Sequence, residues 1–174
     1  MYLHILIGQR REDYPGQYGL EDLGSMTEYD VEANPAYLRD RETEMRSSGE
    51  FNRLAWVRVE VDEDAVDAEL ARDDALEPDW IATPEKGFGI RVLFGRRRGH
   101  YPGEYGLESV ASTDEYGLEN NPDYLAEQAG AAVASREFAA LGFVDLSLEL
   151  AAVRAILYPE DRPLPATLLT GGPE

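Results

Sequence analysis

The amino-acid sequence predicts an α/β fold: a tandem duplication of a β-α-α-β-α unit, forming a pseudo-two-fold layered domain with a small, mainly parallel sheet. The first observation behind this prediction is a repeat, because Tyr14-Pro15-Gly16 recurs as Tyr101-Pro102-Gly103 and 101 − 14 = 87. The second is that apolar runs typical of strands alternate with helical segments, with crossovers long enough for parallel pairing. We therefore expect two repeats, residues 1–87 and 88–174, in one compact domain.

Each repeat begins with a continuous apolar run, Leu3–Ile7 or Ile90–Phe94, which is typical of a strand buried on both faces. Gly8 and Gly95 end these strands. A Tyr-Pro-Gly turn follows, because proline fixes φ at its first central position and glycine supplies a positive φ at the next. We then expect a short helix from about Leu20 to Asp30.

A second helix should begin at Asn34-Pro35 and at Asn121-Pro122, where asparagine is an N-cap acceptor and proline suits the first helical position. It should run to about Ser47 or Ser135. Apolar and polar residues then alternate from Val57 and from Val144, which predicts a half-exposed strand in each repeat. A last helix should start near Asp62 and near Glu149.

The composition excludes several kinds of site. The chain has no cysteine, so disulfides, a thiolate nucleophile and Cys-ligated metal centres are impossible. The run Leu3–Ile7 is too short for a signal peptide or a membrane span, which predicts a cytoplasmic protein without a membrane partner.

The net charge of −19 would repel a nucleic-acid backbone or an anionic membrane surface, so direct nucleic-acid binding is not expected. The charge is uneven. The first repeat has 9 basic and 22 acidic residues, a net charge of −13, whereas the second has 7 and 13, a net charge of −6. Many of the acidic side chains cluster in residues 60–79.

The two repeats have diverged unequally. They share 18 of the 31 positions from Gly8 to Leu38, but only 9 of the 32 from Arg39 to Leu70. The shared positions of the later part are mostly apolar, as in a core. The earlier part also keeps arginines, tyrosines, glutamates and asparagine, which packing alone does not demand.

The candidate binding site is therefore the segment 8–21 and its counterpart 95–108, which leave the end of a buried strand. Arginine offers fork-shaped donors for carboxylate or phosphate, glycine permits close approach near a helix N-terminus, and tyrosine has a rigid face with a polar tip. The predicted binding residues are Arg10, Arg11, Tyr14, Tyr18, Glu21, Arg97, Arg98, Tyr101, Tyr105 and Glu108. In the structural alternative, the arginines pair with Glu21, Glu28 or Glu32 and the loop is only a turn.

Three functional hypotheses follow. The first is a non-enzymatic binding or interaction protein, whose two equivalent loops hold an anionic small molecule or an acidic or phosphate-bearing segment of a protein partner. The second is an acidic inhibitor that mimics nucleic acid and occupies the basic groove of a DNA- or RNA-binding protein. The third is a carboxylate- or metal-dependent hydrolase with Glu21 and Glu108 as base or ligand. No nucleophile triad, phosphate-binding Gly-Lys-Ser/Thr motif or His-rich metal spacing is present, so no catalytic residue, metal or cofactor is predicted.

Overall fold

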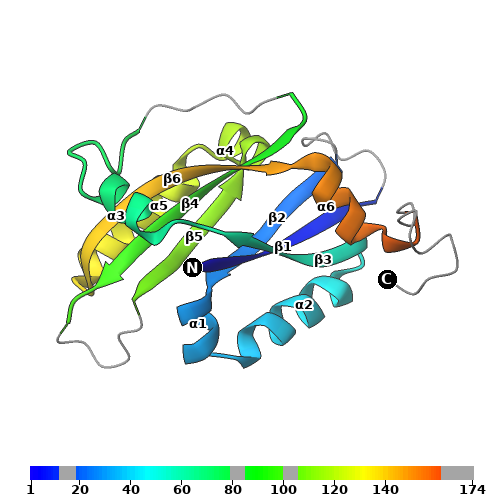
Figure 1. Cartoon of the computed structure of the whole chain (residues 1–174), viewed down its shortest axis with the longest axis horizontal. Coiled ribbons are helices and arrows are strands. Elements are labelled where there is room, and N and C mark those ends of the chain that lie inside the picture. Colours follow the sequence, from blue (N-terminus) through cyan, green and yellow to red (C-terminus); the bar gives the residue numbers. More distant parts are fainter. Residues whose placement is uncertain (12–18, 79–84, 100–105, 162–174) are drawn as a thin grey trace, which may run out of the picture.

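The computed structural model describes residues 1–11, 19–78, 85–99 and 106–161, which form two three-stranded antiparallel sheets covered by helices (Figure 1). The elements of the first half are β1 (Tyr2–Arg10), β2 (Leu20–Thr27), α1 (Glu28–Ala33), α2 (Ala36–Ser48), β3 (Phe51–Glu60) and α3 (Glu63–Leu70). Those of the second half are β4 (Gly87–Arg97), β5 (Leu107–Asp114), α4 (Glu115–Asn120), α5 (Asp123–Ser135), β6 (Phe138–Glu149) and α6 (Leu150–Leu157), followed by a short 3₁₀ turn, Pro159–Asp161.

The two sheets have equivalent topologies. The strand orders are β2-β1-β3 and β5-β4-β6, and the central strand of each sheet pairs antiparallel with both of its neighbours. The mainly parallel sheet predicted from sequence is therefore wrong. The segment after the first loop returns beside β1 as a strand, so each half is β-β-α-α-β-α, and its described strands pair only antiparallel.

The error arose at the helix predicted from about Leu20 to Asp30. Leu20, Leu23 and Met26 are buried and spaced three apart, which is compatible with a helix. In the structure Leu20 belongs to the core between the sheets, whereas Leu23 packs on the other face with Leu6. A strand buried on both faces gives no alternation to read. A register shift opposite Ile5–Ile7 disturbs the pattern further.

Most other predicted elements are confirmed. The apolar runs lie within β1 and β4, the alternating segments lie in β3 and β6, and the last helices begin after Asp62 and Glu149. The prediction that Gly8 and Gly95 end the first strands is wrong, because both glycines pair within the sheets and the strands continue to Arg10 and Arg97. The helix predicted at Asn34-Pro35 begins at Ala36, and the Asn34 side chain does not cap it. Instead, Asn34 ends α1, with its backbone N–H donating to the Asp30 carbonyl.

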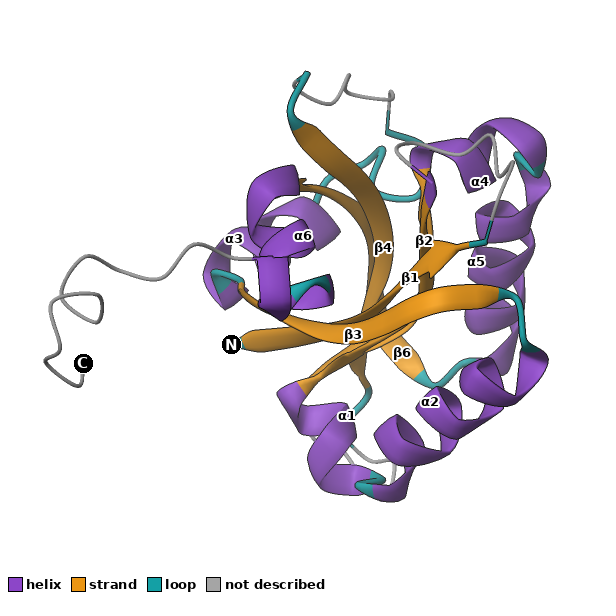
Figure 2. Cartoon of the chain, turned by 90° about the vertical axis from the view of Figure 1, so that its right-hand side faces the viewer, coloured by secondary structure: helices purple, strands orange, loops and turns teal. Residues whose placement is uncertain are grey.

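A single apolar core joins the two sheets. The inner faces of β1 and β4 supply Leu3, Ile5, Ile7, Phe88, Ile90, Val92 and Phe94. Helices α3 and α6 close this core, because Val66, Leu70, Val153 and Leu157 belong to the same cluster. The helices cross between the halves: α3 packs on β6, and α6 packs on β3. Figure 2 shows α3 and α6 on one side of the sheets and α2 and α5 on the opposite side.

The outer faces are covered differently in the two halves. Helix α5 buries Leu125, Ala129 and Ala132 beside β4 and β6, whereas α2 has no fully buried side chain. No helix within the described ranges is long and apolar enough to cross a membrane.

Because the core is shared, a cavity made in one half should weaken both. Ile5→Ala is expected to lower the free energy of unfolding by about 2–5 kcal/mol, since Ile5 is fully buried. Tryptophan fluorescence, which reports on the first half, and far-UV circular dichroism, which reports on both, should share one urea midpoint. Val133→Ala, at a side chain that is 54% exposed, is the control. Two separate transitions would contradict a shared core.

Candidate functional site

The predicted site arginines form two matched clusters, which we call the arginine clasps. In the first clasp, Arg10 Nε donates to Glu21 Oε1 at 2.7 Å and Nη1 donates to Glu50 Oε1 at 2.8 Å. The guanidinium lies over the Phe51 ring, 4.9 Å from its centroid. Hydrogen bonding to Glu21 is the main cause that raises the pKa of Arg10 above its ordinary value. Arg10 is therefore held by two carboxylates and an aromatic face.

The second clasp repeats this geometry 87 residues later. Arg97 Nε donates to Glu108 Oε1 and Nη1 to Glu137 Oε1, both at 2.8 Å, and the guanidinium lies 5.0 Å from the centroid of Phe138. The phenylalanine of each clasp explains why both repeats have glycine at the matched position, Gly8 in the first and Gly95 in the second. A Cβ built on Gly8 or Gly95 would lie 2.6 Å from the ring of Phe51 or Phe138, so only glycine fits under the ring.

The next arginine in each repeat, Arg11 or Arg98, lies at the start of the loop and hydrogen-bonds to a backbone carbonyl. Arg11 Nε donates to the Gly49 carbonyl at 2.7 Å, and Arg98 Nε donates to the Arg136 carbonyl at 2.8 Å. The structure thus brings Arg10 to Glu21 and Arg97 to Glu108, as intramolecular pairs. The tyrosines predicted to join them, Tyr14, Tyr18, Tyr101 and Tyr105, lie outside the described residues.

Glu50 and Glu137 are not among the residues predicted from sequence, although each accepts the second hydrogen bond of its clasp arginine. The signal was available, since these residues match at the offset of 87 and directly precede the shared phenylalanines. They were missed because they lie in the part of the repeat where the matched positions are mostly apolar.

A polar seam joins the two halves where β2 and β5 meet. The Ser25 hydroxyl lies 2.6 Å from that of Ser109 and 3.0 Å from that of Ser112. Thr27 Oγ1 donates to the Leu107 carbonyl at 2.7 Å. Side chains therefore supply much of the hydrogen bonding between two strands that belong to separate sheets.

Two aspartates bridge the seam from opposite sides. Asp30 Oδ2 accepts from the Ser109 backbone N–H at 2.9 Å, and Asp114 Oδ2 accepts from the Asp22 backbone N–H at 3.0 Å. Ser109 and Asp22 are equivalent at the offset of 87, but the two bridging aspartates are not. Burial raises the pKa of both bridging carboxyls. The equivalent bond across the seam is thus made by Asp30, the third residue of α1, on one side and by Asp114, the N-cap residue of α4, on the other.

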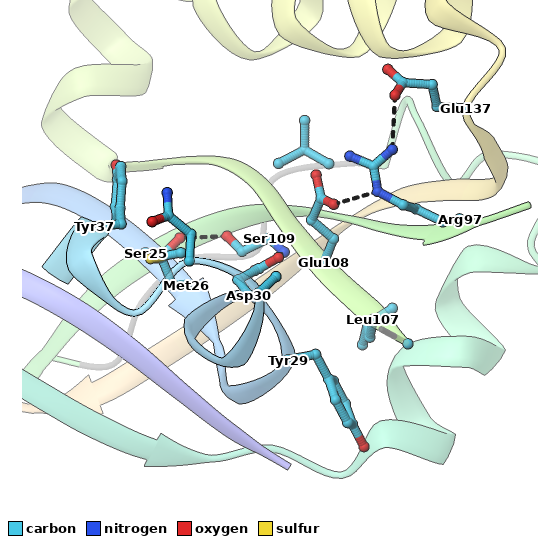
Figure 3. Close-up of a pocket in the computed structure, with 14 residues that line it drawn as sticks. Ser25, Met26, Tyr29, Asp30, Tyr37, Arg97, Leu107, Glu108, Ser109 and Glu137 are labelled. Carbon is cyan, nitrogen blue, oxygen red and sulfur yellow. Dashed lines mark hydrogen bonds and ion pairs between the residues drawn. The ribbon is translucent and has the colours of Figure 1, made fainter. Parts of the chain in front are cut away.

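A cleft of about 570 Å³ opens beside this seam, between α1 and the second clasp (Figure 3). Its charged lining consists of Asp30, Glu108, Glu137 and Arg97. Burial, followed by the nearby charge of Asp30, raises the pKa of Glu108, although the bond from Arg97 opposes the shift. Its other lining residues include Ser25, Met26, Tyr29, Asn34, Tyr37 and Ser109. The cleft thus has three carboxylates for one guanidinium.

A smaller cavity of about 260 Å³ adjoins this cleft and shares Ser25, Tyr37 and Val110 with it. Asp22 lines it, and among the described residues Asp22 Oδ2 is buried without a hydrogen-bond partner. Burial raises the pKa of Asp22 to about 6. The charges of Asp114 and Glu21 add to the shift, and hydrogen bonds from the Ser112 side chain and the Gly24 backbone N–H oppose it. Arg41, also on the wall, donates to the Leu23 carbonyl and to Glu44.

Comparisons of the chain with protein-family models, curated proteins and solved structures found no match. Within the described ranges, no three histidine or acidic side chains converge in a way that could hold a metal ion.

Asp22→Asn should stabilise the protein at neutral pH. The folded-state pKa of about 6 lies above the ordinary value of 3.8, so the cost of ionising Asp22 is absent at low pH and grows as the pH rises through this window. Removing the charge should raise the free energy of unfolding at pH 7.5 by roughly 1–3 kcal/mol and leave it little changed near pH 4. Urea titrations at both pH values measure this. Asp40→Asn on the exposed face of α2 is the control, and a gain equal to that of Asp22→Asn would contradict the assignment.

The clasps should contribute to stability equally. Arg97→Met and Arg10→Met should each lower the free energy of unfolding by about 1–2 kcal/mol, because two partly buried carboxylates lose their donor. Arg98→Met, which removes a bond to an exposed carbonyl, should cost less. Chemical denaturation at constant pH provides the comparison. If Arg97→Met is no more costly than Arg98→Met, the clasp is not a structural pair.

Proposed function

We propose that the protein is a non-catalytic binding protein that holds a cation-bearing partner in the cleft between its two halves. The supporting observation is the charge balance of the cleft, in which Asp30, Glu108 and Glu137 face Arg97 alone. Buried or half-buried charges favour pairing, and a bound cation would offset the excess negative charge. The volume of about 570 Å³ is in the range of pockets that hold small molecules or side chains.

The binding class is the one predicted from sequence, but the geometry favours the opposite ligand charge. An anion at Arg10 or Arg97 would have to displace a carboxylate that already accepts a charge-assisted bond of 2.7–2.8 Å. It would also approach through the field of a chain with a net charge of −19. The same field would concentrate a basic partner near the surface and speed its association.

The acidic-inhibitor hypothesis is the second candidate, and a different cavity favours it. A cavity of about 540 Å³ lies between α3 and β6, and its charged lining consists of one arginine, Arg72, and the acidic side chains of Glu60, Asp62, Glu69, Asp74 and Asp145. Arg72 pairs with Glu69 and Asp74, and Asp145 pairs with Arg91, so acidic side chains outnumber the basic one on the cavity wall. Apolar side chains including Val61, Val66 and Leu146 also line it. This combination suits the aliphatic stem and charged head of lysine or arginine on a basic protein surface.

The hydrolase hypothesis gains less support from the geometry. Its proposed base or ligand residues, Glu21 and Glu108, are each bonded to an arginine of their own clasp. For Glu108 the bond from Arg97 stabilises the charged form and opposes the rise in pKa that burial causes. A substrate or metal ion would also have to compete with the arginine for the carboxylate oxygens of both residues.

The cleft hypothesis predicts saturable binding of a fluorescent tetra-arginine peptide, measured by anisotropy, with affinity that falls as salt rises. Ala33→Trp, which fills the cleft, should weaken binding by about tenfold or more, because the partner loses its desolvated contacts. Ala134→Trp on the exposed side of α5 is the matched control. A tetra-glutamate peptide should not bind. Equal affinities for the two tryptophan variants would mean that the peptide binds the acidic surface diffusely and not the cleft.

A further inference from the structure

The cleft and the smaller cavity form one groove, since Ser25, Tyr37 and Val110 line both. The groove follows the seam between β2 and β5, so residues from both halves line it along its length. A ligand that fills it would contact both halves of the chain at once.

The groove has an anionic group in each of its two parts. In the larger part, Glu108 accepts a bond from Arg97, and Asp30 accepts from Thr27 and from the Ser109 backbone N–H, so the excess is one of charge and not of missing hydrogen bonds. In the smaller part, the Asp22 carboxylate has an oxygen with no hydrogen-bond partner among the described residues. An unpaired buried acceptor is costly, and a proton donor brought by a ligand would relieve that cost. This is an observation independent of the charge balance in the larger cleft.

The part shared by the two cavities is neutral. Tyr37 and Val110 offer apolar surface there, and Ser25 is hydrogen-bonded across the seam. Tyrosine faces accept methylene groups and cations alike. Arg41 also lines the smaller part, and its guanidinium donates to the Leu23 carbonyl and to Glu44. The carboxylates of the two ends, Asp22 on one side and Glu108 with Asp30 on the other, are thus separated by a neutral stretch.

Within the described residues this arrangement is not repeated at the offset of 87, although the two strand orders are equivalent. The counterpart of Asp22 is Ser109, so the matched position has no acid, whereas Asp114 takes the place of Asp30 on the opposite side of the seam. Glu108, by contrast, has the counterpart Glu21 in the first clasp. One ligand per chain is therefore expected.

We propose that this groove binds a linear dication, with two ammonium or guanidinium groups joined by an aliphatic linker, Asp22 anchoring one and Glu108 with Asp30 anchoring the other. The proposal rests on the binding function proposed above and specifies its ligand. Such a ligand can be a free polyamine or two basic side chains of a protein segment, and the shared chemistry is the pair of separated cations. The aliphatic linker would lie along Tyr37 and Val110, away from the charged ends.

Isothermal titration calorimetry at pH 7.5 and low salt tests this with the diamine putrescine, with butylamine as the single-charge control and with an acetylated Lys-Gly-Gly-Lys amide peptide as the protein-like source. Putrescine or the peptide should bind one to one and at least about tenfold more tightly than butylamine, because only a dication reaches both anionic ends. Whichever of the two binds more tightly identifies the source of the dication. Equal affinity for butylamine and both dications would overturn the proposal.

The variants locate the two anchors. Asp22→Asn and Glu108→Gln should each weaken the dication about tenfold and leave butylamine less affected, because each removes one of two charge pairs. Glu50→Gln removes a carboxylate of the first clasp that lines neither cavity and should keep full affinity, which separates binding from loss of a clasp. The urea titration of Asp22→Asn at pH 7.5 shows whether the variant is folded under the binding conditions, which separates lost binding from unfolding. If the tetra-arginine peptide binds in the cleft but Asp22→Asn changes nothing, the cation-binding function stands and the dication proposal fails.

Discussion

The shared core between the two sheets is the constraint on which the rest of the structure depends. Ile5 of one sheet and Ile90 of the other belong to the same apolar cluster, so the sheets must face each other closely. This arrangement brings β2 against β5, and two edge strands that meet inside a protein need partners for their polar groups. Serine hydroxyls and two aspartates provide them across the seam. The groove is a consequence of that solution.

Sequence patterns predicted the elements that follow a single periodicity. The continuous runs of β1 and β4 and the alternation in β3 and β6 each carry a clear signal. Strand β2 did not, because Leu20 and Leu23 are buried on opposite faces and imitate a helical spacing. The antiparallel sheets could not be foreseen once this strand was taken for a helix, since the predicted crossover implied parallel pairing.

The candidate site shows a related limit. Comparing the two repeats selects residues that are the same in both, and it therefore found Arg10, Glu21 and their counterparts, which form equivalent clasps. It could not find Asp22, Asp30 or Asp114, because the residue 87 positions away is different in each case. The backbone N–H donors across the seam are at equivalent positions, Asp22 and Ser109, but the aspartates that accept from them, Asp114 and Asp30, are not. The features that distinguish the halves are the ones that give the groove its charge.

Helices α3 and α6 each pack on the sheet of the other half, and this limits how one half could fold alone. Each half gives its last helix to the sheet of the other, so an isolated half would leave Val66 and Leu70, or Val153 and Leu157, without the strands they cover. A single unit would bury its core only by trading that helix with a second unit, as in a domain-swapped homodimer. The present chain is the covalently joined equivalent of such a dimer. Joining frees the two seam-facing surfaces to become unlike, which an assembly of identical subunits cannot achieve.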